Sequence, residues 1–393
     1  MKRKALVIAP QPFFSPRGTP FSVYYRTLIT AELGVKIDLL TYGQGQDVDI
    51  PGVRIKRIPN FPFWGNVKIG PSFLKLFLDV LLFFKTIGLL LVSRYHFVQA
   101  HEEAIFWGMF LKPIFRFKLV YDMHSSLPEQ ISNFNYSKNR LLIKLFTILE
   151  EKALQKADVI ITICPDLEEQ VRGRCSNHDK IFLIENSIFD PVRLKSTAET
   201  ENNQNEYAFE FDIHNKYILY AGTLEPYQGI DLMIQSMAIV IKKIPSAVLV
   251  IAGGQPRQVQ LYRKIAKEHG LEKVCKFTGF LDKKDVIKLI ERADVVLSPR
   301  IKGNNTPLKI YELLSIGKPI VATKIRSHTQ VLDETCAFLT DPDAESFAEG
   351  IIEALSSKEL VEQKTRRARQ LYEQNYSRAT YIKKMKQWLE RLN

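Results

Sequence analysis

The feature that most constrains this chain is a repeated alternation of short β-branched runs with helical stretches, interrupted once near the middle. Such runs predict strands buried on both faces, and the helices between them predict a covered parallel sheet. The first series of expected strands comprises Lys4–Ala9, Val35–Tyr42, Val53–Ile58, Phe97–His101, Lys118–Met123, Asp158–Cys164 and Ile181–Asn186. The second comprises Tyr217–Gly222, Ala247–Gly253, Val274–Thr278, Val295–Ser298, Pro319–Thr323 and Ala337–Thr340. The pattern predicts an α/β chain with two doubly wound, Rossmann-like domains.

A polar stretch without periodicity, Ser196–Asn205, separates the two series and predicts a linker. We expect a first domain at residues 1–190, the linker at 191–215, a second domain at 216–375, and a C-terminal helix at 376–393 that can cross back to the first domain. Doubly wound sheets bind ligands outside the carboxyl ends of their strands, so two such domains predict a site in a central cleft between them.

Charge and cysteine content narrow the partners and the compartment. The 393 residues carry a net charge of +12, shared by both halves, which favours phosphorylated ligands, acidic glycans or an anionic lipid surface. A basic excess that is not confined to one tail argues against a nucleic-acid-binding arm. The four cysteines are scattered without a C-x-x-C pair, which predicts a reducing cytoplasm and no zinc site.

One strongly apolar segment, Phe73–Val92, is about long enough to span a bilayer. Lys75, Asp79 and Thr86 gather on one side of its helical wheel, which predicts an amphipathic helix with a wide apolar face. Three interpretations remain open: a membrane span, a helix packed on a sheet, and a helix lying on the inner face of the cytoplasmic membrane. The last would make this a peripheral membrane protein.

The segment that most strongly predicts chemistry runs from Ser298 to Thr323. It contains an expected strand end, a polar loop, a helix and a tight return through Gly317 into the next strand. Pro307 suits the first turn of a helix, and Thr306 can cap it. The N-terminus of such a helix presents free N–H groups and partial positive charge, which suit a diphosphate.

Three charged side chains near this helix start have distinct expected roles. Arg300 and Lys309 could add full positive charges to a diphosphate site. Glu312 lies one turn beyond Lys309, where its carboxylate could accept the hydroxyl protons of a ribose. The alternative is an ordinary helix with a Lys/Glu surface pair.

The same segment resembles the donor-site signature of the family 4 retaining glycosyltransferases with the GT-B fold. That signature has a Glu, seven further residues and a second Glu. Glu312 occupies the second position, which implies a ribose contact, whereas Asn304 stands at the first. The resemblance implies that donor binding involves Asn304, Asn305, Thr306, Pro307, Leu308 and Glu312.

A second resemblance to the family lies in Tyr220–Ile230. The family carries an Arg after the glycine and a Lys before a later glycine, both reaching the diphosphate. Here Thr223 follows Gly222, and Gln228 stands at the second place, so two cations are missing. Arg300 and Lys309 are our candidates to replace them. The resemblance also implies that Gly222, Thr223 and Gly253 lie at strand ends facing the donor.

In the first half, the resemblance predicts residues that face the acceptor and the transferred sugar. A Gly-containing loop places Arg17, Gly18 and Thr19 as acceptor or phosphate contacts, although a structural turn is an alternative. His124 ends an expected strand and is implied to lie near the donor sugar. The acceptor-side candidates also include two residues at the end of another strand, His101 and Glu102.

The resemblance implies a glycosyltransferase of the retaining, hexosyl-transferring kind. Its donor would be a nucleotide-sugar such as a UDP-sugar, and its acceptor a glycan or a lipid-linked molecule in polysaccharide or glycolipid biosynthesis. His124, Arg300 and Lys309 are the expected catalytic residues. No D-x-D cluster is placed to hold a metal, so we predict metal-independent transfer without a cofactor. A nucleotide-sugar epimerase or hydrolase, a catalytically degenerate subunit and a general anion binder are the alternatives.

Overall fold

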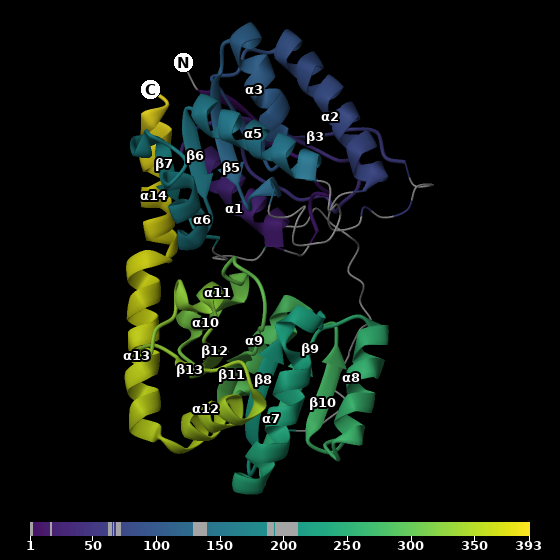
Figure 1. Ribbon diagram of the computed structural model, residues 1–393, viewed down its shortest axis with the longest axis vertical. Helices are drawn as coiled ribbons and strands as arrows, with labels where there is room; N and C mark the ends of the chain where they lie inside the picture. The colour runs from purple at the N-terminus through teal and green to yellow at the C-terminus, as the bar shows by residue number, and fades with distance from the viewer. Residues whose placement is uncertain are drawn as a thin grey trace. The chain divides into compact units, whose positions relative to one another are not determined.

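The computed structural model describes residues 3–15, 18–61, 65, 67, 72–128, 140–186, 192 and 211–393. The pattern of contacts divides the chain into two compact units. Unit 1 comprises Met1–Glu199 together with Ser377–Asn393, and unit 2 comprises Thr200–Tyr376. The C-terminal segment therefore belongs to the unit that contains the N-terminus (Figure 1).

Unit 1 is built on a seven-stranded sheet in the order β3-β2-β1-β4-β5-β6-β7, in which every pair of neighbours is parallel. Its strands are β1 (Lys4–Ala9), β2 (Lys36–Thr41), β3 (Val53–Arg57), β4 (Phe97–His101), β5 (Lys118–Met123), β6 (Val159–Thr162) and β7 (Ile181–Leu183). The central strands are almost completely buried, as expected for a parallel sheet covered on both faces.

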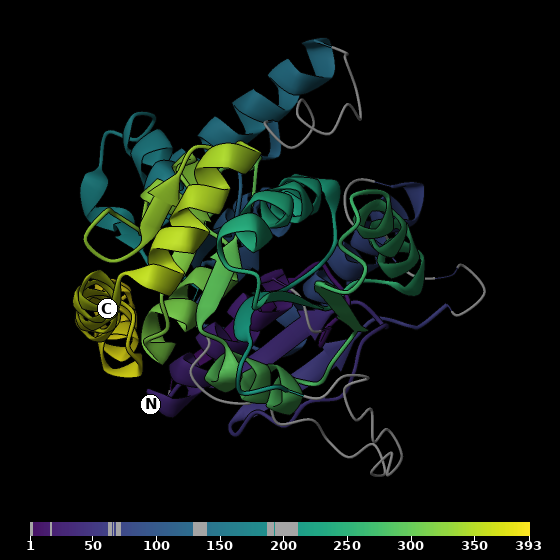
Figure 2. The same cartoon turned by 90° about the horizontal axis from the view of Figure 1, so that it is seen from below.

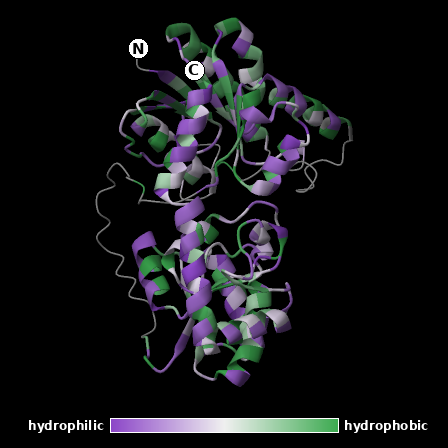
Figure 3. Ribbon diagram, turned by 90° about the vertical axis from the view of Figure 1, so that its left-hand side faces the viewer, coloured by the Kyte–Doolittle hydropathy of each residue, from purple (hydrophilic) through white to green (hydrophobic). Residues whose placement is uncertain are grey.

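Helices cover both faces of this sheet. One apolar core joins the sheet to α1 (Gly18–Glu32) and α14 (Arg378–Arg391). The other joins it to α2 (Phe73–Val92), α3 (Ala104–Phe115), α5 (Arg140–Lys156) and α6 (Pro165–Arg172). Ser377 caps α14 by accepting a hydrogen bond from the N–H of Thr380, a role that serine often has at a helix N-terminus. This last helix is seen end-on beside the label C in Figure 2, and its outer side is largely hydrophilic in Figure 3.

Unit 2 repeats the plan with a six-stranded parallel sheet in the order β10-β9-β8-β11-β12-β13. Its strands are β8 (Lys216–Ala221), β9 (Ala247–Ala252), β10 (Cys275–Gly279), β11 (Val295–Ser298), β12 (Ile320–Thr323) and β13 (Phe338–Thr340). One core contains α7 (Ile230–Lys243), α8 (Pro256–Glu268) and α12 (Ala344–Ser356). The other contains α9 (Lys283–Arg292), α10 (Leu308–Ile316) and α13 (Lys358–Asn375).

The prediction of two Rossmann-like sheets is confirmed. One local expectation changes: α1 begins at Gly18, so that Gly18 and Thr19 lie in its first turn. Of the interpretations left open for Phe73–Val92, the structure shows a helix packed on a sheet. Among the residues that the structure describes, no helix combines the length and the apolar content required to cross a bilayer.

A candidate donor site and a buried histidine cluster

Glycines allow neighbouring backbone segments to approach each other closely at the carboxyl edge of the sheet in unit 2. The N–H of Gly222 donates to the carbonyl of Ala252 at 2.9 Å, and the N–H of Gly253 donates to that of Gly279 at 2.7 Å. Gly253 has a φ of 115°, and a Cβ atom on it would lie 2.1 Å from the Gly222 oxygen. Only glycine fits there, so this edge presents backbone rather than side chains.

Two strand-to-helix loops pack against each other at this edge. The loop after β11 meets the loop after β8, since the N–H of Ile301 donates to the carbonyl of Tyr227 at 3.0 Å. Gly229 lies so close to the other loop that a Cβ atom on it would be 1.9 Å from the Pro299 oxygen. The two segments that carry the predicted donor-site residues are therefore neighbours.

Arg300 organises the loop between β11 and α10. Its Nε donates to the carbonyl of Lys302 at 2.6 Å and one Nη donates to that of Asn305 at 3.1 Å. Its guanidinium also lies 5.3 Å from the centre of the Tyr227 ring, a cation–π distance. The side chain thus holds the two loops together while keeping a positive charge at the strand ends.

The ammonium of Lys309 has no anion beside it among the residues that the structure describes. Its Nζ has almost no contact with solvent and no hydrogen-bond partner within the described residues. It lies 4.2 Å from the centre of the Tyr220 ring. Burial, and secondarily the charge of Arg300, lower the pKa of Lys309 to about 7. Because an unpaired buried cation is costly, this arrangement suits an anionic ligand.

The start of α10 is open. Its N-cap is Pro307, without a side-chain cap, so the prediction that Thr306 caps the helix is wrong. The backbone turns from extended to helical at Pro307, and the buried hydroxyl of Thr306 has no hydrogen-bond partner in the ranges that the structure describes. The N–H of Ile310 donates back to the carbonyl of Pro307 at 3.0 Å, which leaves the N–H groups of Leu308 and Lys309 without an intrahelical acceptor. They add partial positive charge beside Lys309.

The other predicted donor-site residues lie in the same loops, but their roles in binding remain predictions. Glu312 is half-buried one turn along α10, with a carboxylate oxygen 3.5 Å from Nζ of Lys283. Asn304 is exposed, and its carbonyl accepts a hydrogen bond from Gln330. Thr223 is exposed as well. Asn305 meets Arg300 through its backbone, as described above.

His328 supports this loop, and the sequence analysis missed it. Nδ1 of this fully buried residue lies 2.8 Å from the carbonyl of Thr323, and Nε2 lies 2.9 Å from the hydroxyl of Ser298. The Thr323 hydroxyl in turn donates to the carbonyl of Arg300. Burial lowers the pKa of His328 to about 4, so the ring is neutral and donates from Nδ1. A lone histidine outside any motif gives no signal for this role.

In unit 1 a buried ion pair lies at the carboxyl end of β5. Arg26 of α1 pairs with Asp122, and both side chains are fully buried. Gln99 donates a further hydrogen bond to this carboxylate at 2.7 Å. Burial alone would raise the pKa of Asp122, but Arg26 and two nearby histidines hold it well below its usual range. The sequence offered one signal for the pair, since Arg26 is the one basic residue in α1.

The two histidines are His101 and His124, which the pair of strands β4 and β5 brings together. Nδ1 of His101 lies 3.1 Å from Nε2 of His124, and each nitrogen lies 3.4 Å from an oxygen of Asp122. Burial lowers the pKa of His101 to about 4 and that of His124 to about 3, so both rings are neutral at pH 7. One ring must then donate to the other.

This triad could geometrically hold a metal ion, because its ligand atoms lie within 4.8 Å of one another. Arg26 already pairs with the carboxylate, however, and its fixed positive charge opposes a second cation at the same oxygens. We therefore interpret the cluster as an Arg–Asp pair that orients two neutral histidines.

The remaining acceptor-side candidates are spread over unit 1. Glu102 follows β4 with a φ of 49°, an uncommon backbone conformation for a non-glycine residue. Burial, and then the neighbouring Glu103, raise the pKa of Glu102 to about 8. Gly18 and Thr19 lie at the start of α1, and Arg17 lies outside the described residues. Their contacts with an acceptor remain predictions.

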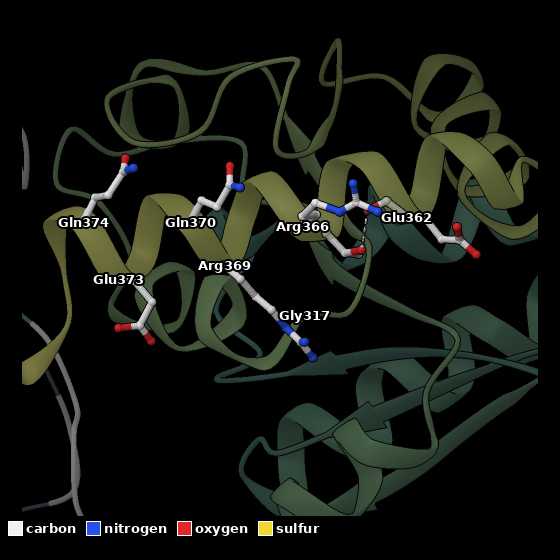
Figure 4. A pocket seen from close by; sticks show the side chains of 8 residues that line it. Gly317, Glu362, Arg366, Arg369, Gln370, Glu373 and Gln374 are labelled. Atoms are coloured by element: carbon white, nitrogen blue, oxygen red, sulfur yellow. Dashed lines mark hydrogen bonds between the residues drawn. The ribbon is translucent and has the colours of Figure 1, made fainter.

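A hollow of about 610 Å³ lies elsewhere on unit 2. It is lined by α13 residues and by Gly317, towards which Arg369 points in Figure 4. Gly317 ends α10, so this hollow lies by the amino ends of the strands. Ligands of doubly wound sheets bind at the opposite edge, which argues against the hollow as the donor site.

Comparisons with known proteins agree with this geometry. The family profile described as Glycosyl transferases group 1 matches residues 203–371, and the one described as Glycosyltransferase Family 4 matches residues 23–189. The chain belongs to the family 4 glycosyltransferases. The candidate glycosyltransferase YtcC of Bacillus subtilis (strain 168) is 27% identical over 238 residues, which is 56% of this chain and 56% of that protein. The chain thus spans about half the length of that relative.

Solved structures extend the likeness over the whole chain. Sucrose-phosphate synthase from Thermosynechococcus elongatus is similar with a TM-score of 0.75 at 19% identity, over 99% of each chain. Anabaena HepE in complex with UDP-glucose gives a TM-score of 0.70 at 17% identity, over 98% of this chain and 99% of that one. At these identities the likeness establishes the GT-B fold, as the sequence predicts, and the family membership identifies a glycosyltransferase.

Proposed function

We propose that this glycosyltransferase moves a hexose from a UDP-sugar to an acceptor hydroxyl, with retention of anomeric configuration and without a metal ion. The observation that carries the proposal is the buried ammonium of Lys309, which lies beside the N-terminus of α10 and finds no counter-ion in the described part of the chain. A diphosphate supplies the missing negative charge. The complex of Anabaena HepE with UDP-glucose supports the choice of a uridine nucleotide.

In this proposal the donor binds unit 2. Glu312 accepts hydrogen bonds from the ribose hydroxyls, while Gly222 and Gly253 keep the strand edge clear for the nucleotide. The bond between the anomeric carbon and the β-phosphate oxygen breaks, and negative charge grows on that oxygen. Lys309, Arg300 and the N–H groups of α10 stabilise this charge, which replaces the role that a metal plays in other transferases.

The acceptor contacts unit 1, where neutral His124 lies beside the transferred sugar in our proposal. The acceptor hydroxyl bonds to the anomeric carbon and loses its proton to the departing phosphate oxygen. The low pKa of His124 suits hydrogen bonding to a sugar hydroxyl and does not suit proton storage near pH 7. We propose a glycan or lipid-linked acceptor in the cytoplasm.

Calorimetric titration with UDP, GDP and ADP, with and without Mg²⁺, tests the donor site. We expect UDP to bind saturably and with the same affinity when Mg²⁺ is present. Lys309→Met should weaken UDP binding by roughly ten-fold or more, since a charge-assisted contact of about 1.5–3 kcal/mol is lost. Lys302→Met, which removes an exposed lysine from the same loop, is the matched control.

Glu312→Ala tests the ribose contact separately. It should weaken binding of UDP but hardly change binding of inorganic diphosphate, because only the nucleotide carries a ribose. Equal affinity of wild type and Lys309→Met for UDP would refute the diphosphate site. Hydrolysis of UDP-glucose without any acceptor, at the full rate of the enzyme, would favour a hydrolase instead.

A further inference from the structure

Helix α2 lies on unit 1 with its polar side turned inward. Thr86 is 1% exposed and bonds back to the carbonyl of Leu82. The ammonium of Lys75 pairs with Glu103 at 2.6 Å, and the hydroxyl of Tyr42 donates to Asp79. The polar groups of this amphipathic helix are thus used against the sheet, which leaves much of its apolar side facing outward. A surface helix of a soluble protein normally has the reverse orientation.

The outward side of α2 continues onto α3 and α5, which pack with it in one layer over the sheet (Figure 1). Phe73 is 94% exposed and Phe84 63%. The large exposed apolar side chains of the three helices are Phe73, Leu76, Phe77, Val80, Phe84, Leu91, Val92, Phe110, Ile114, Leu141, Leu145 and Ile148. We call this set the apolar face. So many exposed apolar side chains on neighbouring helices indicate an interaction site.

The charges around the apolar face are mostly positive. The exposed basic residues of α2 and α5 are Lys85, Lys144, Lys152 and Lys156, and Arg116 ends α3. Among the described side chains of the three helices, Glu151 is the only exposed acid, because Asp79 faces inward and Glu150 is buried. A surface that combines apolar side chains with lysines suits the headgroup boundary of an anionic bilayer.

We propose that the apolar face docks unit 1 onto an anionic phospholipid surface. The aromatic and aliphatic side chains of α2, α3 and α5 enter the headgroup boundary, and the surrounding lysines contact lipid phosphates. The inward charges of α2 bind it to the sheet, so the helix lies on the membrane without crossing it. A second copy of this chain is a poorer occupant, because it would bring the same excess of lysines against this one.

This inference deepens the lipid-linked acceptor of the proposed function, but its test needs neither donor nor acceptor, so the two can fail separately. Purified protein is floated with vesicles of phosphatidylcholine alone or of phosphatidylcholine mixed with phosphatidylglycerol, at low and high salt. We expect binding to the anionic vesicles that weakens as salt rises. The double variant Leu76→Ser/Phe84→Ser should bind roughly ten-fold or more weakly.

Matched variants separate the apolar and electrostatic contributions. Lys85→Glu/Lys144→Glu should lose roughly five-fold in vesicle affinity per lysine and become less sensitive to salt. Leu261→Ser and Lys243→Glu, at exposed positions of unit 2, should bind like wild type. Thermal unfolding checks that each variant is folded. We expect all of them to fold, because the substitutions place polar or charged residues at exposed positions.

Three outcomes would overturn the proposal. The first is wild-type protein that stays with neither vesicle. The second is vesicle binding that the variants of α2 and α5 leave unchanged. The third is a dimer, detected by light scattering, that Leu76→Ser/Phe84→Ser dissociates, because the apolar face would then be an interface between two copies of this chain.

Discussion

At the residue scale, the titration of Lys309 gives donor binding a pH signature. The pKa of this ammonium is lowered to about 7 by burial and by Arg300, so above pH 7 much of it is neutral without ligand. A bound diphosphate favours the charged form and raises the pKa. Binding at pH 8 should therefore take up a proton, and UDP affinity should fall as pH rises from about 7 to about 9.

Calorimetry in two buffers of different ionisation enthalpy measures this proton uptake directly. Lys309→Arg keeps the charge at all these pH values and should abolish the uptake while retaining part of the affinity. Binding enthalpies that are the same in both buffers for the wild type would show that Lys309 does not change protonation when UDP binds.

The buried pair Arg26–Asp122 makes a second residue-scale prediction. Arg26→Met leaves the Asp122 carboxylate buried without its cation, and we expect a loss of about 3–5 kcal/mol in the free energy of unfolding. Arg26→Met/Asp122→Asn removes both charges and should recover much of that loss. Urea denaturation measures both variants. A double variant that is no more stable than Arg26→Met would show that Asp122 does not depend on Arg26 to neutralise its charge.

At the element scale, the carboxyl edge of the sheet in unit 2 depends on Gly253. An alanine at this position is strained by the positive φ. Its Cβ atom would also collide with the Gly222 oxygen, which should move β8 and β9 apart. We expect Gly253→Ala to destabilise unit 2 by about 1–3 kcal/mol or more and to weaken UDP binding. Gly270→Ala is the control, since Gly270 also has positive φ (70°) but nothing lies within 4 Å of its Cβ position. If Gly253→Ala and Gly270→Ala destabilise the protein equally, the loss of stability comes from the positive φ alone and not from the contact with Gly222.

The helices and strands were predictable because each buried strand appears in the sequence as a β-branched run, and each helix as apolar residues repeating with the helical period. The order of those elements fixed the fold class before any contact was known. The orientation of α2 was not predictable in the same way. A helical wheel separates Lys75 and Asp79 from the apolar side, but only partners distant in the chain, Glu103 and Tyr42, decide which side faces the sheet.

The candidate site divides similarly. Lys309 and Glu312 stand in a recognisable segment, so the sequence alone places them at the start of a helix after a strand. A residue that stabilises the loop from another part of the chain gives no such signal. His328 contacts this loop only because β11 and β12 are neighbours in the sheet. The capping prediction for Thr306 failed because capping depends on the backbone angles of Pro307, which residue type alone does not determine.

At the scale of the whole molecule, the chain leaves unit 1, builds unit 2 and returns. The returning helix α14 completes the core of unit 1: Trp388 is fully buried and meets the ring of Phe97 edge-on at 5.6 Å. Trp388→Ala should therefore destabilise unit 1 by about 3–5 kcal/mol. Because unit 2 has its own cores, UDP binding to folded protein should be unchanged.

Hydrogen exchange distinguishes the two units in this variant, because each has its own protected strands. Protection of β1 and β4 should fall in Trp388→Ala, while that of β8 and β9 should remain. Lys386→Ala, on the exposed side of the same helix, controls for changes in helix propensity and should keep the protection of all four strands. Equal loss of protection in β8 and β9 would mean that the two units unfold as one cooperative body, so that donor binding to unit 2 would depend on the last turns of the chain.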